Sequence, residues 1–366
     1  MAAAADEDGA GPPHPRDNTL LLGHAAAEAQ VLSALAQGRL AHGWLITGPR
    51  GVGKATLAYR IARYLLSGQS GGPDLFGAPP DSLAVDSGNE NFRQVAAGAH
   101  PDLSVVEREA DTRGRMRSVI AVDQIRRLGE RFALTSASGS WRIAIVDGAE
   151  EMNPNAANAL LKLLEEPPPR SLLLLVSHAP GRLLPTIRSR CRQLALRPLS
   201  DALVAETVSR CLPELPADQL ADLAALADGS PGRALRLAAL DGLATYAEIQ
   251  SVLAALPVVD FARVHDLGDK LARSNQEPAY RAWLELLGLA LTRLIRIGAM
   301  PADMAGGTPV ERENGARLAR LAPLDRWVEL WEKVTDLADR ADSVNLDRKQ
   351  VIFNTFVMLE ATARRA

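Results

Sequence analysis

The chain has 366 residues, enough for two or three domains, and its 47% hydrophobic and 23% charged residues are ordinary for a soluble globular protein. The formal net charge of −3 excludes DNA binding through overall charge, so any contact with DNA must be local or shared with partners. The two cysteines, Cys191 and Cys211, form no metal-binding spacing and favour a reducing, cytoplasmic location. No apolar run is long enough to cross a membrane, and residues 1–17 lack a signal-peptide core and are expected to form a disordered tail.

A glycine-rich turn is the most informative feature of the first part of the chain. Apolar spacing predicts an amphipathic helix over 25–35, a buried strand over 44–47 and, after the turn, a helix over 57–66. The turn itself reads Gly48-Pro49-Arg50-Gly51-Val52-Gly53-Lys54-Ala55-Thr56. A strand, a glycine-rich turn and a lysine at a helix start form a P-loop, whose N–H groups cradle phosphates while the lysine reaches the β and γ oxygens. The candidate nucleotide-binding residues here are Gly48, Gly51, Gly53, Lys54 and Thr56.

The P-loop pattern is incomplete at one position. The full pattern is Gly-x4-Gly-Lys-Ser/Thr, and Ala55 stands where the hydroxyl that ligates Mg²⁺ is expected. Thr56 does not simply replace it, because one step along a helix turns the side chain by about 100°. ATP binding is therefore expected at most at a degenerate site, and a glycine-rich turn that binds nothing is the alternative.

Strands and helices alternate beyond the turn. Residues 67–99 are rich in Gly, Pro, Ser, Asp and Asn and are interpreted as an irregular surface insertion. The elements predicted after it are strands over 103–106, 141–146 and 172–176 and helices over 119–132 and 155–164. Largely apolar strands separated by helices predict an α/β fold with a parallel sheet covered on both faces.

The strand that ends in Asp147 has the form of a Walker B motif, whose aspartate normally holds Mg²⁺. Hydrolytic ATPases of this kind place a glutamate next, to activate the attacking water, but this chain has Gly148 there. Glu150 lies too far along the chain to be assumed equivalent. The alternative is that Asp147 only caps the segment that follows the strand.

The motifs together resemble the clamp-loader branch of the AAA+ ATPases. The matching segments are Leu40–Lys54, Ala99-His100-Pro101-Asp102-Leu103, Asn158–Lys162 followed by Leu164-Glu165-Glu166-Pro167, and Ser189-Arg190-Cys191. Within the branch, Asp147-x-Ala-Glu-x-Met-Asn153 is similar to the delta-prime family of bacterial DNA polymerase III, whereas the tau/gamma motor subunits carry Asp-Glu there and Lys-Thr-Thr in the P-loop. The likeness covers about residues 18–240, and beyond them only the helical character agrees.

The resemblance implies a domain plan. After the tail, an AAA+ P-loop domain is expected over 18–196, a small helical lid over 197–242 and an all-α collar, the oligomerisation domain, over 243–366. Helices are expected in the lid over 201–211 and 217–227, and in the collar over 280–297, 324–337 and 346–363. Their apolar stripes form a bundle core, and in this family the bundle also packs against its counterparts in a ring.

The resemblance also assigns roles to individual residues. Arg190 corresponds to an arginine finger that enters the ATP site of a neighbouring subunit, and a solvated basic patch with Arg188 and Arg192 is the alternative. Arg233 corresponds to the second sensor, which contacts nucleotide in its own subunit, or else it caps a lid helix. His178 lies at the first sensor position and is interpreted as structural. Many relatives carry a four-cysteine zinc module between the P-loop and His100, but residues 67–99 contain no cysteine, so no zinc or other metal site is expected.

Three functional hypotheses follow. The favoured one is a clamp-loader subunit that does not hydrolyse ATP and acts in a hetero-oligomer with tau/gamma and delta subunits, contacting the sliding clamp and primed DNA through the complex. It would thereby belong to the DNA polymerase III holoenzyme, which is a DNA-directed DNA polymerase and hence a nucleotidyltransferase. The second is an active AAA+ ATPase motor of the tau/gamma type, against which Ala55 and Gly148 both count. The third, a separate nucleic-acid-binding module, lacks a basic and aromatic array.

Overall fold

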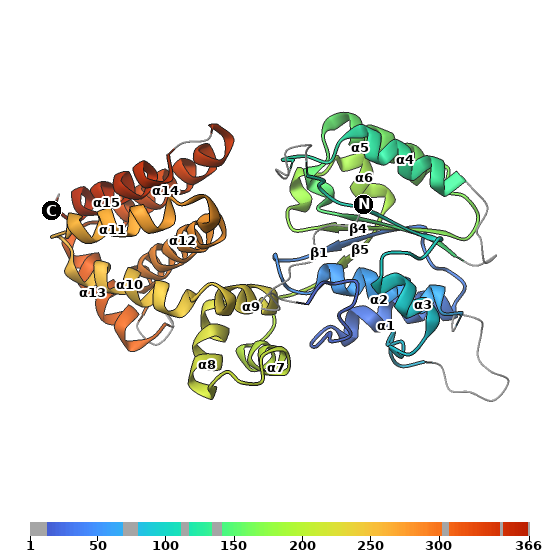
Figure 1. Ribbon diagram of the computed structural model, residues 1–366, viewed down its shortest axis with the longest axis horizontal. Helices are drawn as coiled ribbons and strands as arrows, with labels where there is room; N and C mark the ends of the chain where they lie inside the picture. The colour runs from blue at the N-terminus through green and yellow to red at the C-terminus, as the bar shows by residue number, and fades with distance from the viewer. Residues whose placement is uncertain are drawn as a thin grey trace. The chain divides into compact units, whose positions relative to one another are not determined.

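The computed structural model describes residues 13–68, 80–110, 117–133, 141–301, 307–344 and 347–364. Contacts divide the chain after Ala234 into two compact units, which are taken in turn below (Figure 1). The finer domain boundaries expected at 196 and 242 stay predictions. Among the described helices none is both long and apolar enough to span a bilayer.

A parallel sheet lies at the centre of the first unit. Its strands are β1 Gly43–Thr47, β2 Leu103–Val106, β3 Arg142–Asp147, β4 Ser171–Ser177 and β5 Arg192–Ala195. They are arranged in the order β2-β3-β4-β1-β5, and every neighbouring pair is parallel. The predicted α/β class with a parallel sheet is confirmed. The fifth strand was not predicted, because in β5 only Leu194 is buried and the segment shows no apolar run.

Helices cover both faces of the sheet, as Figure 1 shows. One face is covered by α1 Ala25–Ala36, α2 Lys54–Leu66 and α3 Glu90–Ala96, and the other by α4 Val122–Ala133, α5 Pro154–Glu165 and α6 Pro185–Arg190. Two short 3₁₀ turns, η1 Ala149–Glu151 and η2 Pro180–Arg182, follow β3 and β4. Because both faces are covered, every residue of β4 is buried, which accounts for its continuous apolar run.

The interpretation of residues 67–99 as wholly irregular was wrong at its end. Residues 69–79 lie outside the described part, but α3 forms where Asn89 accepts hydrogen bonds from the N–H groups of Asn91 and Phe92. Phe92 and Val95 are buried, and the Arg63 guanidinium lies 4.7 Å from the Phe92 ring centroid. A helix of seven residues is too short for apolar periodicity to reveal it.

The N-terminal segment packs on α2. Residues 1–12 of the expected tail lie outside the described part, whereas a turn forms over residues 15–17. Arg63 donates hydrogen bonds to the carbonyl oxygens of Arg16 at 3.1 Å and Asn18 at 2.8 Å. These contacts bring the segment that precedes α1 alongside the helix that begins at the P-loop.

Short helices follow the sheet. They are α7 Asp201–Cys211, α8 Ala217–Leu226 and α9 Pro231–Ala239, and the first two lie where helices were predicted. Ser200 caps α7 by accepting from the N–H of Leu203. The division between the two units falls within α9.

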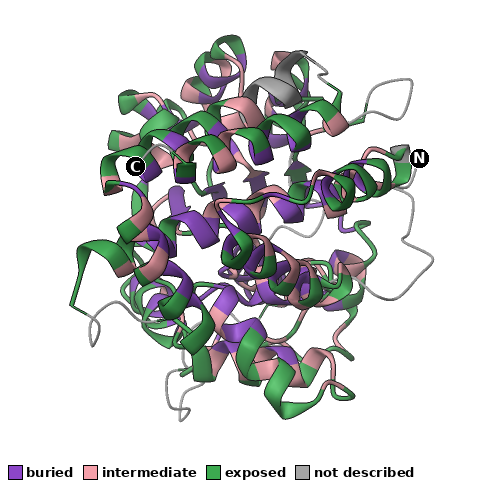
Figure 2. Cartoon of the chain, turned by 90° about the vertical axis from the view of Figure 1, so that its left-hand side faces the viewer, coloured by how far each residue is buried: buried purple, intermediate pink, exposed green. Residues whose placement is uncertain are grey.

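The described residues of the second unit form helices only. They are α10 Gly242–Ala255, α11 Phe261–Leu271, the 3₁₀ turn η3 Ser274–Gln276, α12 Glu277–Ala299, α13 Pro309–Leu321, α14 Leu324–Val344 and α15 Arg348–Arg364. The long α12 is central, and its Trp283, Leu287 and Leu294 are buried. Figure 2 shows buried residues along one side of individual helices and exposed residues along the other. The predicted all-α C-terminal part is confirmed.

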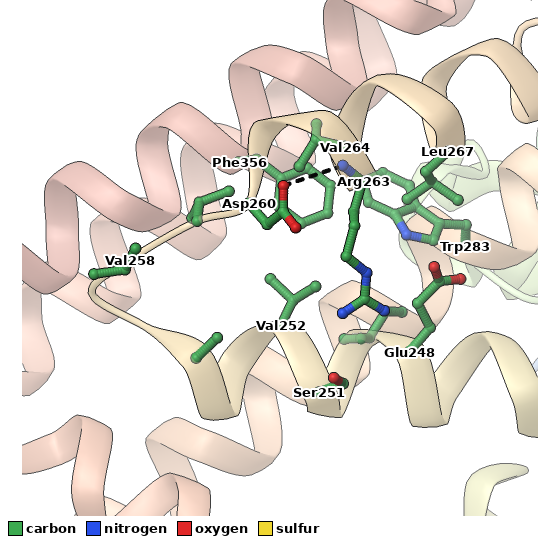
Figure 3. Close-up of a pocket in the computed structure, with 13 residues that line it drawn as sticks. Glu248, Ser251, Val252, Val258, Asp260, Arg263, Val264, Leu267, Trp283 and Phe356 are labelled. Carbon is green, nitrogen blue, oxygen red and sulfur yellow. Dashed lines mark hydrogen bonds between the residues drawn. The ribbon is translucent and has the colours of Figure 1, made fainter.

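A small pocket opens between α10 and α11 (Figure 3). Its volume is about 80 Å³, and Val252, Val264, Trp283 and Phe356 form much of its apolar wall. A space of this size holds a few water molecules or one small apolar side chain.

Candidate nucleotide-binding site

The carboxyl ends of three neighbouring strands bring the candidate residues together. In the register of the sheet, Thr47 at the end of β1 lies beside Ser177 of β4, and Asp147 at the end of β3 lies beside Val176. The P-loop leaves β1 at this edge. Ligands of open parallel sheets bind outside the carboxyl ends of the strands, so topology alone places the P-loop and Asp147 at one site.

The P-loop glycines adopt conformations that other residues rarely reach. The φ angles of Gly48, Gly51 and Gly53 are 146°, 78° and 109°. A Cβ added to Gly48 would lie 2.5 Å from the carbonyl oxygen of Leu196, so the strand end fits only a glycine there. The predicted P-loop is therefore formed in its backbone and leads directly into α2 at Lys54.

Backbone donors gather at the start of α2. The first helical hydrogen bond at this end runs from the N–H of Leu57 to the carbonyl oxygen of Gly53. Within the part of the chain that the structure describes, no acceptor is present for the N–H groups of Gly51, Gly53, Lys54, Ala55 and Thr56. A cluster of unpaired N–H groups at the positive end of a helix is an anion-binding arrangement.

The charges at the site are unevenly distributed. Lys54 is 7% exposed, its Nζ donates to the carbonyl oxygen of Pro49 at 2.6 Å, and burial lowers its pKa to about 8 against the effect of the Asp147 and Glu150 carboxylates. Burial, and next the Glu107 carboxylate, raise the pKa of Asp147, while Lys54 acts in the opposite direction. One buried ammonium group therefore faces several carboxylates.

Glu150 is fixed against the end of β4, a contact that the sequence did not reveal. Its side chain is 1% exposed, its Oε1 accepts a hydrogen bond from the N–H of His178 at 3.0 Å, and the same oxygen contacts the His178 imidazole. Burial acts to raise the pKa of Glu150, but backbone donors, above all the His178 N–H, hold it below its usual range. Glu150 therefore contributes a negative charge that acts on Lys54, and its contact is with His178, whose structural role stays a prediction.

Gly148 occupies a turn that disfavours a catalytic side chain. Its φ angle is 75°, and a Cβ at this position would lie 2.6 Å from Oε2 of Glu151. Glu151 is itself held by Arg108 at 2.9 Å and approached by Arg50 at 3.8 Å. The backbone after Asp147 is therefore shaped for glycine, and a glutamate there would be strained.

The second-sensor segment lies directly on the P-loop. The Ser230 hydroxyl donates to the carbonyl oxygen of Arg50 at 2.7 Å, and the N–H of Gly232 donates to that of Gly51 at 2.9 Å. A Cβ at Gly232 would lie 3.0 Å from the Cα of Gly51, so the two backbones touch. Arg233 is 14% exposed in its side chain and pairs with Asp228 at 3.1 Å. The predicted contact of Arg233 with nucleotide, or else its capping of a lid helix, stays a prediction.

Arg190 ends α6 and makes its described contacts away from the P-loop. Its side chain is 38% exposed, pairs with Glu165 at 2.9 Å and donates to the carbonyl oxygen of Thr186 at 3.2 Å. The guanidinium of Arg192 lies 4.9 Å from the Trp44 ring centroid, a packing contact, and Nε of Arg188 is buried. Arg190 and Arg192 are both exposed and Arg188 is half-buried, so the finger role of Arg190 stays a prediction.

Two long-range hydrogen bonds that were not predicted hold the segments around the P-loop. Burial lowers the pKa of His24, and its Nε2 donates to the carbonyl oxygen of Val52 at 2.8 Å. Arg60 donates to the carbonyl oxygen of Thr19 at 2.9 Å. Both contacts join residues more than 25 positions apart, so no local sequence pattern predicts them. Within the described residues, no group of three or more His, Cys, Asp or Glu side chains is placed to hold a metal ion.

Cys191 follows Arg190 and offers a direct check of the packing around it. The residue is 8% exposed, and burial raises the pKa of its thiol to about 11. We expect iodoacetamide at pH 8 to alkylate Cys191 on the order of 10²-fold more slowly in the native protein than in urea, because the thiolate is the nucleophile. Mass spectrometry of timed samples gives both rates. Equal rates would mean that the connection from α6 to β5 opens readily.

Part of the chain is similar in sequence to known proteins. A family model described as DNA polymerase III, delta subunit, matches residues 23–200. Over these residues the chain is similar to that family. The Pseudomonas aeruginosa DNA polymerase III subunit delta' is 43% identical over 197 residues, which are 54% of this chain and 56% of the relative. The Escherichia coli subunit delta' is 33% identical over 210 residues, 57% of this chain and 58% of the relative.

The likeness extends to gamma/tau subunits of DNA polymerase III. The Mycobacterium tuberculosis DNA polymerase III subunit gamma/tau is 32% identical over 270 residues, 72% of this chain and 44% of the relative. The chain spans about half the length of the curated delta' relatives that it matches. The predicted resemblance to the delta-prime family is confirmed.

Proposed function

We propose that this chain is a clamp-loader subunit of the delta-prime type, which does not hydrolyse ATP and supplies Arg190 to the ATP site of an adjacent subunit. The observation that carries the proposal is the pair of lost catalytic positions. Ala55 has no oxygen for Mg²⁺, and Gly148 has a left-handed backbone where a water-activating glutamate would be strained. Two independent requirements of hydrolysis are absent, while the P-loop backbone is intact.

The site fits a nucleotide only in part. The five unpaired N–H groups and Lys54 suit the α- and β-phosphates. Asp147 is the one Mg²⁺ ligand of the usual pair, and Thr56, at the neighbouring helical position, is 7% exposed and projects about 100° away from the Ala55 direction. Mg²⁺ does not fit this donor set, so we assign no hydrolytic step to it.

The proposed partners follow from the resemblance to delta-prime subunits. The subunit would assemble with tau/gamma and delta subunits in a cytoplasmic hetero-oligomer and reach the sliding clamp and primed DNA through that complex. Assembly would be carried by the helical unit after Ala234, and catalysis would be influenced through the exposed Arg190.

An active motor of the tau/gamma type is the second candidate, favoured by the 270-residue match to a gamma/tau relative. A turnover assay separates the two. We expect the purified chain to hydrolyse ATP no faster than background in Mg²⁺ buffer, measured by phosphate release. The Lys54→Ala variant, which removes the ammonium from the phosphate site, is the control for contaminating activity. Turnover well above background that disappears in Lys54→Ala would establish the motor instead.

A further inference from the structure

We propose that the P-loop site binds a nucleoside diphosphate, without Mg²⁺, in preference to a triphosphate. The proposal rests on the non-hydrolysing function proposed above, because it explains what a formed P-loop does in a subunit that has no use for a third phosphate. Two features of the site support it. One part presents N–H groups and an ammonium group to anions, and the other carries carboxylates.

The anion-binding end is the P-loop itself. The N–H groups of Gly51, Gly53, Lys54, Ala55 and Thr56 have no acceptor among the described residues, and they surround the start of α2. The ammonium of Lys54 uses one of its three hydrogens on Pro49. Five N–H groups, two free ammonium hydrogens and a helix N-terminus suit the α- and β-phosphates of a nucleotide.

The other part of the site carries the negative charges of two carboxylates, and one of them is held in place by hydrogen bonds. Glu150 is 1% exposed and is held by the N–H and the imidazole of His178. Asp147, at the end of the adjacent strand, is half-buried, and the charges of Glu107, Glu150 and Lys54 act on it. A terminal phosphate beside Lys54 would come under the charge of the same carboxylates that act on Lys54, and like charges repel.

The groups that usually neutralise the charge of a terminal phosphate are absent here or are paired with carboxylates. Ala55 contributes no ligand for a Mg²⁺ ion that would bridge the β- and γ-phosphates. Arg233, at the second-sensor position, pairs with Asp228 and would have to leave that contact to reach a phosphate. The guanidinium groups of Arg108 and Arg50 lie 2.9 Å and 3.8 Å from the Glu151 carboxylate, which already neutralises part of their charge. A diphosphate avoids the carboxylates and still uses the whole N–H cluster.

Isothermal titration of the full chain with ADP and with ATP, each in EDTA and in Mg²⁺, tests the proposal. We expect ADP to bind roughly tenfold or more tightly than ATP, and its affinity to be unchanged by Mg²⁺. Lys54→Ala should abolish binding of both nucleotides. Glu150→Gln should strengthen ATP binding and narrow the preference by roughly tenfold, since it removes one charge and keeps the side-chain shape. Glu130→Gln is the matched control. It converts an exposed carboxylate on α4 to an amide and should leave both affinities unchanged.

A second variant keeps the test valid if Glu150→Gln folds poorly, which a thermal melt will show. Ala55→Thr restores the missing hydroxyl and should raise ATP affinity in Mg²⁺ but not in EDTA, whereas the isosteric Ala55→Val should not. The proposal is overturned if wild-type chain binds ATP as tightly as ADP, or binds neither at millimolar concentration. It is also overturned if both Glu150→Gln and Ala55→Thr leave the ratio unchanged. None of these results implies ATP turnover, so the proposed function is judged separately by phosphate release.

Discussion

Replacing Arg190 by alanine is expected to reduce ATP hydrolysis on the order of 10³-fold at one site of a reconstituted clamp loader, the site that borders this subunit. The change should leave the fold intact, because Arg190 is partly exposed and its ion pair with Glu165 is a surface pair of the kind worth 0–1 kcal/mol. Bulk hydrolysis should fall only in part, since the other sites keep their own fingers. Clamp loading onto primed DNA should fall further, because it needs the sites to act together.

The neighbouring arginines provide controls with different expected defects. Arg192 lies over Trp44, so Arg192→Ala should cost about 1 kcal/mol of stability and leave hydrolysis nearly unchanged. Arg188 is partly buried in α6, and Arg188→Ala should likewise be milder than Arg190→Ala in the hydrolysis assay. Glu165→Gln removes the surface partner of Arg190 but keeps the guanidinium, so it should preserve hydrolysis.

Single-turnover hydrolysis and a clamp-loading assay on primed DNA measure these differences, and circular dichroism checks the fold of each variant. The finger assignment is wrong if Arg190→Ala loads clamps at the wild-type rate. It is equally wrong if the three arginine variants behave alike, because the three side chains would then form one solvated basic patch.

The fold could be predicted from the sequence wherever burial leaves a long one-sided or continuous apolar pattern. Strand β4 is buried along its whole length and was predicted nearly to its ends. Strand β5 and helix α3 were not predicted, because β5 buries one residue of four and α3 is a single short helix defined by its Asn89 cap. Elements whose formation depends on a neighbour or a cap leave little periodic signal.

The same distinction applies to the site: residues within a local sequence pattern could be predicted, and long-range contacts could not. Gly48, Gly53, Lys54 and Asp147 could be assigned because each lies at a fixed spacing within one local strand-turn-helix or strand-end pattern. The contact of Glu150 with His178 could not, because it joins residues 28 positions apart through side-chain geometry. The contact of Gly232 with Gly51 spans an even longer interval and depends on backbone conformation at both glycines.

In the helical unit, loss of Glu311 at the start of α13 is expected to destabilise the protein strongly. Its side chain is 2% exposed and accepts hydrogen bonds from the Tyr246 hydroxyl, from the Arg293 guanidinium at 2.6 Å and from the N–H of Thr308 at 2.5 Å. The Thr308 hydroxyl in turn accepts from the N–H of Glu311, which completes a capping box. One carboxylate therefore joins α10, α12 and α13.

Glu311→Ala should lower the free energy of unfolding of this unit by about 3–5 kcal/mol, the range found when one partner of a buried ion pair is removed. The substitution takes away the carboxylate that neutralises Arg293, which is 8% exposed, and it opens the cap of α13. Glu311→Gln should cost less, because the amide keeps an acceptor for Thr308 and nearly the same volume. Hydrogen exchange followed by mass spectrometry reports the opening of α10 and α13 separately from the rest of the chain.

The pH dependence gives an independent measure of the same carboxylate. Burial acts to raise the pKa of Glu311, but its hydrogen bonds, led by that from Tyr246, hold it below the ordinary value of 4.5. Its stabilisation is therefore complete above that pH and is lost as the pH falls through the folded-state pKa, because the unfolded chain then binds the proton more readily. Peptides from α13 should lose protection in acid in the wild type, and Glu311→Ala should lack this part of the pH response. Glu329→Ala, which removes an exposed carboxylate near Arg326 and Lys333, should change protection by no more than about 0.5 kcal/mol. A loss in Glu311→Ala as small as that of Glu329→Ala would show that the buried network contributes no more than a surface pair.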